Sequence, residues 1–210
     1  MIIRTYPVGM IETNCYILID EKSGEAAVID PGYASEKLKE ALKAPEIKKV
    51  KYILLTHGHF DHVLGVYDIQ QLTGAQTAIH KNEVKCLSDE RASLAGEVAP
   101  GLQKSVKCDI ELREGMHLKL GELDIEVIFT PGHTSGGCCF KVGNVLFSGD
   151  TLFCGSVGRC DLPGGNYEKL IESVKKIDNL FKGEDLRVLS GHGEETTLNA
   201  ERRYNPYMRY

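Results

Sequence analysis

Histidines gather at three places in this chain, and each place follows a short apolar run. Five of the seven histidines lie in the segments THGHFDH (56–62), PGHTSGG (131–137) and SGHG (190–193). The apolar run before each segment is typical of a buried strand, and Asp150 ends another such run, VLFSGD. Strand ends and the loops after them are where a rigid scaffold can hold reactive groups. The pattern therefore favours a β-rich fold that presents several strand ends.

The remaining pattern predicts sheets with helices outside them. Apolar runs between turn residues predict strands or strand hairpins over residues 14–20, 26–30, 51–56, 76–80, 118–130, 138–150 and 186–190. Helical spacing of apolar residues predicts helices over 35–44, 61–73 and 167–181, whereas residues 81–111 fit neither pattern. Hairpins occur in both halves and helices follow them. We therefore expect one α+β domain over residues 1–210, with two mixed β-sheets flanked by helices.

Composition excludes several kinds of partner. A hydrophobic fraction of 42% allows a sizeable core, and the net charge of -5 gives no general attraction for nucleic acid or an anionic membrane. Residues 1–14 lack the apolar stretch of a signal peptide, and no run approaches the roughly 18 apolar residues that span a bilayer. We expect a soluble cytoplasmic protein that acts on a small molecule. The sequence leaves open a homo-oligomer.

The cysteines show no framework of disulfides. Their count of seven is odd and no C-x-x-C pair occurs, so reduced thiols are expected. Cys138 and Cys139 lie in an apolar strand, where we expect them to fill the core. Cys154 and Cys160 lie in a glycine-rich loop, and we assign no role to them.

The first histidine segment can present ligands in two directions. His57 and His59 flank one residue and can point the same way from an extended segment, while Asp61 and His62 begin a helix. Imidazole nitrogen and carboxylate oxygen are the ligands that zinc prefers and that iron or manganese also accept. The segment therefore indicates a metal site.

A structural role must be weighed against metal binding. A lone histidine after a strand is usually a polar residue with ordinary partners, and we expect this of His80 and His117. An H-x-H-x-D-H motif alone is a moderate signal. His133, His192 and Asp150, each beside a glycine at a strand end, make the structural alternative weak.

Four segments together resemble the metallo-β-lactamase superfamily: THGHFDH, GHTSGG, SGDTLF and SGHG. Their order and spacing fit along nearly the whole chain. The stretches GDTLFCGSVGRCDLPGG and GHGEETTLNAERRYNP are similar to the glyoxalase II-like (hydroxyacylglutathione hydrolase-like) branch, in its short single-domain form. The resemblance implies an αββα sandwich with the site at one edge of the two sheets.

The resemblance also implies seven ligands for two divalent ions, expected to be zinc, with iron or manganese as alternatives. The first ion would be held by His57, His59 and His133, the second by Asp61, His62 and His192, and Asp150 would bridge both. Two ions roughly 3.5–4 Å apart can lower the pKa of a shared water, giving a hydroxide that attacks a carbonyl carbon. Asp61 and Asp150 would orient that hydroxide, and no serine or cysteine nucleophile is required.

The implied activity is hydrolysis of a small acyl thioester. Full-length glyoxalase II enzymes carry a C-terminal helical region that supplies much of the glutathione contact, whereas 18 residues follow His192 here. We therefore expect weak recognition of glutathione. A persulfide dioxygenase of the same branch, with one iron held by two histidines and an aspartate, is the first alternative. A lactonase or another ester hydrolase is the second. A metal-binding module without activity is disfavoured, because no ligand is missing.

Two residues are candidates for substrate contacts. The loop over 155–165 follows Asp150 closely, so we expect it near the ions. Arg159 could bind a substrate carboxylate, although a pair with Asp161 that holds the loop is favoured. Thr134 could offer its hydroxyl to substrate, although capping a turn is the favoured role.

Overall fold

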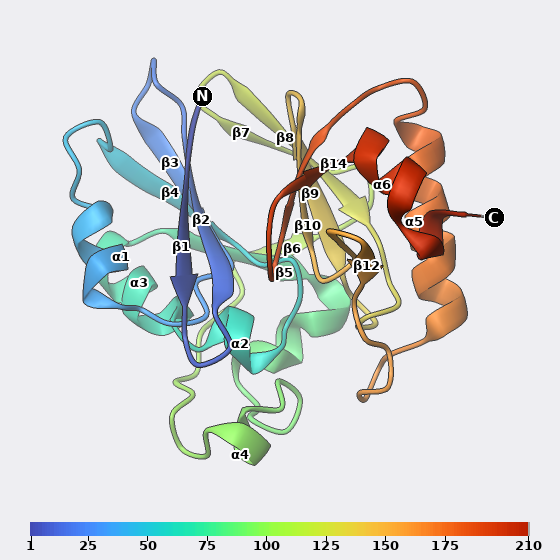
Figure 1. Cartoon of the computed structure of the whole chain (residues 1–210). Coiled ribbons are helices and arrows are strands. Elements are labelled where there is room, and N and C mark those ends of the chain that lie inside the picture. The colour runs from blue at the N-terminus through green and yellow to red at the C-terminus, as the bar shows by residue number, and fades with distance from the viewer. Residues whose placement is uncertain (210) are drawn as a thin grey trace.

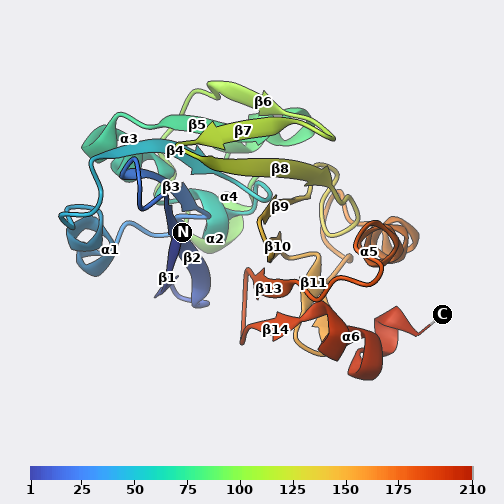
Figure 2. The ribbon, with the colours of Figure 1, turned by 90° about the horizontal axis from the view of Figure 1, so that it is seen from above.

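The computed structural model describes residues 1–209 and has two six-stranded sheets packed face to face (Figures 1 and 2). The first sheet has the order β1-β2-β3-β4-β5-β6 and contains β1 (Ile2–Val8), β2 (Thr13–Ile19), β3 (Glu25–Ile29), β4 (Lys49–Leu54), β5 (Gln76–His80) and β6 (Ile110–Leu112). Its first three strands are antiparallel, and the pairs from β3 to β6 are parallel.

The second sheet has the order β14-β13-β10-β9-β8-β7. It contains β7 (His117–Leu120), β8 (Leu123–Phe129), β9 (Cys138–Val142), β10 (Val145–Gly149), β13 (Arg187–Ser190) and β14 (Thr196–Thr197). Only the β10–β13 pair is parallel, so both sheets are mixed, as predicted. A small hairpin lies in the glycine-rich loop, formed by the two-residue strands β11 (Leu152–Phe153) and β12 (Ser156–Val157).

Helices cover the outer face of each sheet. Figure 2 shows α1 and α3 beside the first sheet and α5 and α6 beside the second. The helices are α1 (Glu36–Ala41), α2 (Phe60–Val63), α3 (Val66–Thr73), α4 (Ala95–Val98), α5 (Tyr167–Leu180) and α6 (Leu198–Tyr204), with short 3₁₀ helices η1 (Lys81–Leu87) and η2 (Pro206–Met208). The predicted α+β sandwich is confirmed. Within residues 1–209, no helix has the length and apolar character needed to cross a membrane.

The alternation of side chains along the strands builds three layers of core. On β2, Tyr16 and Leu18 point into the cluster between the sheets, whereas Ile17 points into the cluster under α1 and α3. On β9, Cys138 lies between the sheets and Cys139 lies in the third cluster, under α5 and α6. Both thiols are buried, as expected, because a central strand of a sandwich is covered on both faces.

The prediction of one helix over residues 61–73 was wrong, because the structure breaks it at Gly65 into α2 and α3. The loop after β3 passes so close that a Cβ at Gly65 would lie 2.3 Å from the carbonyl oxygen of Pro31. The apolar residues keep a helical spacing on both sides of the break, so the spacing alone did not reveal it. The break fixes α2 as a single turn at the end of the sandwich.

The segment that the sequence left unassigned, residues 81–111, covers this same end of the sandwich. It forms η1, α4 and β6 with irregular turns between them. The amide of Phe60 donates a hydrogen bond of 2.8 Å to the carbonyl oxygen of Ser93, so the segment packs directly on the first histidine motif. Its position makes it one wall of the site described next.

Candidate metal centre

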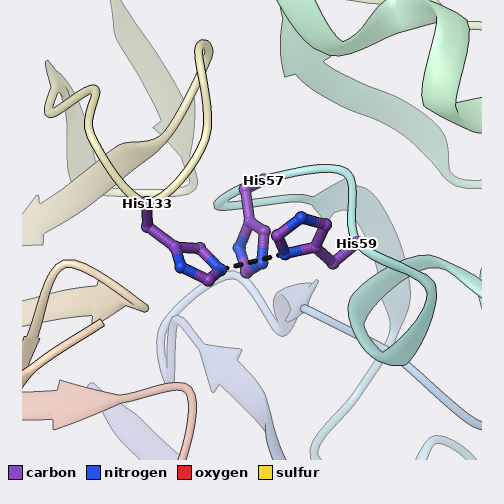
Figure 3. A group of neighbouring side chains, drawn as sticks. All are labelled: His57, His59 and His133. Atoms are coloured by element: carbon purple, nitrogen blue, oxygen red, sulfur yellow. Dashed lines mark hydrogen bonds between the residues drawn. The ribbon is translucent and has the colours of Figure 1, made fainter. Parts of the chain in front are cut away.

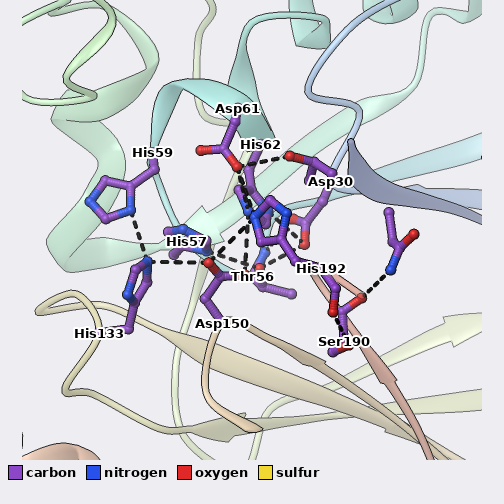
Figure 4. A network of polar contacts seen from close by, with 12 residues as sticks. Asp30, Thr56, His57, His59, Asp61, His62, His133, Asp150, Ser190 and His192 are labelled. Carbon is purple, nitrogen blue, oxygen red and sulfur yellow. Dashed lines mark hydrogen bonds and ion pairs between the residues drawn. The ribbon is translucent and has the colours of Figure 1, made fainter. Parts of the chain in front are cut away.

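All seven predicted ligands meet at one end of the two sheets (Figure 4). The loop after β4 carries His57 and His59, and α2 carries Asp61 and His62. The three residues from the second sheet follow the ends of β8, β10 and β13; they are His133, Asp150 and His192. The sheets are brought together here by the hydrogen bond from the amide of Cys138 to the carbonyl oxygen of Thr56, at 2.8 Å.

The first group of donor atoms belongs to three buried histidines, His57, His59 and His133 (Figure 3). One nitrogen from each ring lies within 4.8 Å of the others, and His59 Nδ1 lies 2.9 Å from His133 Nε2. Zinc–nitrogen bonds of about 2.0–2.1 Å in a tetrahedral site would place the nitrogens about 3.3 Å apart. The three rings therefore fit a divalent cation with only small adjustment.

The second group contains Asp61, His62 and His192, and Asp150 lies between it and the first group. Asp61 Oδ2 lies 3.2 Å from His62 Nε2 and 3.1 Å from His192 Nε2. Asp150 Oδ1 lies 3.5 Å from His62 Nε2, whereas its Oδ2 lies 3.5 Å from His133 Nε2. One carboxylate thus faces both groups of donors.

Several of these atoms lack hydrogen-bond partners although they are fully buried. Among residues 1–209, no partner is found for His57 Nε2, His62 Nε2 or Asp150 Oδ1. A buried polar atom without a partner costs about 1–3 kcal/mol, which a bound cation would offset. The donor set, its spacing and these unpaired atoms all fit divalent metal ions.

Residues behind the rings fix which nitrogen faces the cluster. His133 Nδ1 donates to the carbonyl oxygen of Arg159 at 2.6 Å, which leaves Nε2 free to bind. Thr56 Oγ1 donates to Asp30 Oδ2 at 2.7 Å, so its lone pair can accept from His57 Nδ1 at 3.2 Å. Such outer hydrogen bonds set the tautomer and orientation of metal-binding imidazoles.

Asp30 is a site residue that the sequence did not reveal. It is buried, its backbone φ of 51° is unusual for a residue other than glycine, and its Oδ1 accepts the amide of Thr56 at 2.8 Å. Its Oδ2 lies 3.1 Å from His62 Nδ1, close enough for an ion pair but not aligned as a hydrogen bond. Backbone strain of this kind concentrates at functional sites. The available signal was an acidic residue at a strand end directly before Pro31.

The pKa values of two buried histidines in the cluster fit the binding of a cation. Burial, and next the neighbouring His133, lower the pKa of His59 to about 3, so this ring is neutral and can bind a cation. Burial alone would lower the pKa of His62, but the carboxylates of Asp61, Asp30 and Asp150 outweigh it and raise that pKa. A divalent cation would satisfy the same carboxylates and leave His62 neutral.

Comparison with known proteins agrees with this geometry. Residues 8–192 match the model of the metallo-beta-lactamase superfamily. The chain belongs to the metallo-β-lactamase superfamily. It is 42% identical to an uncharacterized protein of Aquifex aeolicus, over 99% of this chain and 97% of that protein. It is 34% identical to the hydroxyacylglutathione hydrolase GloC of Haemophilus influenzae, over 99% of this chain and 98% of that protein.

Solved structures of the superfamily superpose along the chain. BLEG-1, a B3 metallo-β-lactamase, has a TM-score of 0.90 at 32% identity and covers all of both chains. TTHA1623, solved in a di-iron-bound form, has a TM-score of 0.83 at 34% identity, over 97% of this chain and 99% of that one. ETHE1 from Myxococcus xanthus has a TM-score of 0.79 at 26% identity, over 98% of this chain and 84% of that one.

In this member of the superfamily, a buried glutamate joins the two loops that hold the first group. Glu83 Oε2 accepts the amide of Gly58 at 2.8 Å, and its Oε1 accepts the amide of Gly136 at 2.7 Å. Both glycines are required by the close approach: a Cβ at Gly136 would lie 2.2 Å from Glu83 Cγ. Glu83 lies in η1, within the segment that the sequence left unassigned, so it was missed.

A cavity of about 600 Å³ opens over the cluster. It is lined by five of the donor residues, by Glu97 and Arg159, and by the apolar side chains of Ile11, Phe60, Leu94, Val98, Phe153 and Leu162. Leu94 has a backbone φ of 66°, which is strained for a leucine, and its side chain is held in this wall. The cavity can therefore take a small, largely apolar molecule.

The two candidate substrate contacts lie in different places. Arg159 lines the cavity, but its guanidinium makes two hydrogen bonds of 2.7 Å to Asp161, the pair favoured from the sequence. Thr134 is buried and does not line the cavity, and its Oγ1 has no hydrogen-bond partner among residues 1–209. Its hydroxyl therefore makes no capping bond with the described residues.

The other histidines and cysteines lie outside the cluster. His80 stacks on Phe129 with ring centroids 4.4 Å apart, and His117 pairs with Asp124 at 2.7 Å on the surface. All seven cysteines are free; in the glycine-rich loop, Cys154 is exposed and Cys160 is partly exposed. Neither loop thiol belongs to a group of donor atoms that could hold a metal, among the residues described.

Proposed function

We propose that this protein is a metal-dependent hydrolase that cleaves small acyl thioesters and holds two divalent ions. The observation that carries the proposal is the position of Asp150, whose carboxylate lies 3.5 Å from His133 Nε2 of the first group and 3.5 and 3.6 Å from His62 Nε2 and His192 Nε2 of the second. One carboxylate between two groups suits a pair of adjacent ions. A site for one ion at the first group would not use Asp61, His62 and His192 as ligands.

The donor residues would hold the ions in two sets, with His57, His59 and His133 for the first and Asp61, His62 and His192 for the second. Two divalent ions there would lower the pKa of a shared water and polarise the carbonyl of the substrate. Asp61 and Asp150 both border the cavity, so their oxygens can accept hydrogen bonds from that water and orient it. Thr13 Oγ1 donates to Asp61 Oδ2 at 2.8 Å and restrains that carboxylate.

The lining of the cavity favours a thioester over an amide. Among residues 1–209, Glu97 and Arg159 are the titratable side chains of the lining besides the donor residues; Arg159 is paired with Asp161, and Glu97 is exposed to solvent. A thiol has a pKa of about 8.5, so it can leave as a thiolate without receiving a proton. An amine must be protonated as it leaves, which requires a placed general acid. A good leaving group therefore suits this site better.

The relatives support the same class of reaction. GloC, which this chain matches over 98% of its length, is named a hydroxyacylglutathione hydrolase. A protein with nearly the same extent as this chain therefore carries the name of a thioester hydrolase, which supports the proposed substrate class. The di-iron form of TTHA1623 supports two ions in a similar structure and makes iron a candidate beside zinc and manganese.

A metal titration tests the proposal. Metal-free protein is titrated with zinc, bound metal is measured by mass spectrometry, and hydrolysis of S-acetyl-N-acetylcysteamine is followed by release of the thiol. We expect activity to reach its maximum at two zinc ions per chain. A His117→Ala variant serves as the control and should bind the same amount. Two bound ions without thiol release, in the zinc, iron and manganese forms alike, would contradict the proposal.

A further inference from the structure

A second cavity, of about 390 Å³, adjoins the one over the metal centre. The two share Phe60 and Asp61 as common walls. The other side chains of the second cavity come from Met10, Tyr33, Leu64, Ala99 and Leu102, which we call the acyl groove. These residues lie in four segments that are far apart in the sequence: the β1–β2 turn, the β3–α1 loop, the C-terminal end of α2, and the chain after α4.

Several large apolar side chains of the acyl groove are exposed to solvent. The exposed fractions are 75% for Met10, 67% for Leu102 and 58% for Tyr33. Two more exposed apolar residues, Ile11 and Val98, border the neighbouring cavity over the metal centre. A contiguous apolar surface of this kind marks a binding site more often than scattered apolar residues do.

The charges around the acyl groove exclude most polar ligands. Asp61 is its only charged lining residue, and that carboxylate is directed to the metal cluster, 3.2 Å from His62 Nε2. Among residues 1–209, no lysine or arginine lines the groove itself. Lys39 and Lys104 line the next cavity, and they pair with Glu36 and Asp68 rather than with a free anion site. The groove fits an uncharged, flexible apolar chain that begins near Asp61.

We propose that the acyl groove binds the linear aliphatic chain of an acyl thioester, so that the preferred substrates carry medium-length acyl groups. The inference rests on the function proposed above, because the carbonyl must lie at the metal centre. The two cavities adjoin at Phe60 and Asp61, and the sequence neighbours Met10 and Ile11 line one cavity each, as do Ala99 and Val98; this adjacency commits the groove to the substrate. A chain attached to that carbonyl passes Phe60, the wall common to both cavities, and continues past Leu64 toward Leu102.

The expected effect follows from the burial of methylene groups. Complete transfer of one methylene from water into apolar contact favours binding by about fourfold, and an open groove buries each only in part. We therefore expect kcat/KM to rise about threefold per methylene, which is about 80-fold between butyryl and octanoyl substrates.

The test uses metal-loaded protein and N-acetylcysteamine thioesters with acyl chains of two, four, six and eight carbons. The same series is measured for Leu102→Glu and Met10→Glu, which place a charge in the groove. Leu180→Glu is the matched control, since Leu180 is also an exposed leucine, at 52%, but lies on α5 outside both cavities. We expect the rise with chain length in the wild type and in the control, and its loss in both groove variants. Melting temperature and bound metal show that the variants are folded.

Failure of the groove and failure of the proposed function give different results. If no thioester is hydrolysed, the proposed function itself fails. If the acetyl substrate is hydrolysed but the wild-type series is flat, only the groove is refuted. A series unchanged in Leu102→Glu, or a dependence on the length of the thiol instead of the acyl group, also overturns it. A flat series in a dimer that Leu102→Glu dissociates would assign the groove to contact between two copies.

Discussion

Replacing Glu83 should loosen the metal centre without touching a metal ligand. The side chain is 4% exposed, and its two oxygens accept the amides of Gly58 and Gly136. Each hydrogen bond to a charged acceptor contributes about 1.5–3 kcal/mol. We therefore expect Glu83→Ala to lower the free energy of unfolding by about 3–5 kcal/mol, a large part of the roughly 5–15 kcal/mol of a typical domain.

Glu83→Gln separates the two bonds. The amide oxygen of glutamine can still accept one backbone N–H, but its NH₂ group faces the other, and two donors repel. We expect a loss of half the effect of alanine, about 1.5–2.5 kcal/mol, with the fold retained. Because the two glycines belong to the loops of His57 and His133, metal affinity should fall about 10- to 100-fold for one ion, as it does for outer-shell partners elsewhere.

The measurements are denaturant unfolding of the metal-free protein and competition for zinc with a chromophoric chelator. Glu111→Gln is the matched control, since Glu111 is exposed and only pairs with Arg113 at 3.7 Å. That variant should change the free energy of unfolding by less than about 0.5 kcal/mol. If Glu83→Gln matches the control in both stability and zinc affinity, the role assigned to Glu83 is refuted.

Three further predictions concern the reaction. Asp150→Ala should abolish activity and weaken both ions, whereas His80→Ala and His117→Ala keep normal metal content; two ions bound normally in Asp150→Ala would disprove the shared carboxylate. Cys154→Ser and Cys160→Ser, alone or together, should keep most of the hydrolytic rate, and a loss of several orders of magnitude with intact metal content would reveal a thiol-dependent mechanism. S-lactoylglutathione should show a high Michaelis constant in steady-state kinetics, because few contacts are available for the remote part of glutathione; strict dependence on the glutathionyl group would argue against this.

The cluster of histidines and aspartates and the sandwich could be predicted because both rest on repeated chemical patterns. A continuous apolar run such as Tyr16 to Ile19 specifies a strand that is covered on both faces, and the structure places these residues so. Four histidines beside glycines at strand ends, with His62 close after them in the same motif, are typical of a metal site. Once the two sheets pack face to face, the segments that carry these histidines come together at one end of the sandwich.

Other residues of the site and its walls belong to no sequence motif that could have revealed them. Asp30 and Glu83 are single acidic residues, and only their burial beside His62 or two loop amides reveals their importance. The segment over 81–111 is held by tertiary contacts, such as that from the amide of Phe60 to Ser93, and has no periodicity of secondary structure. The acyl groove is assembled from four distant segments, so no local pattern could show it.

The most direct test of the central claim compares hydrolysis with oxygen consumption in defined metal forms. Hydrolysis needs a Lewis acid and a hydroxide, so redox-inactive zinc suffices, whereas dioxygen chemistry needs a metal that changes oxidation state. We predict that the zinc form hydrolyses an acyl thioester without consuming oxygen, and that His62→Ala loses most of that activity. Oxygen uptake with glutathione persulfide, seen only in the iron form and retained in His62→Ala, would contradict the account and make the protein a persulfide dioxygenase.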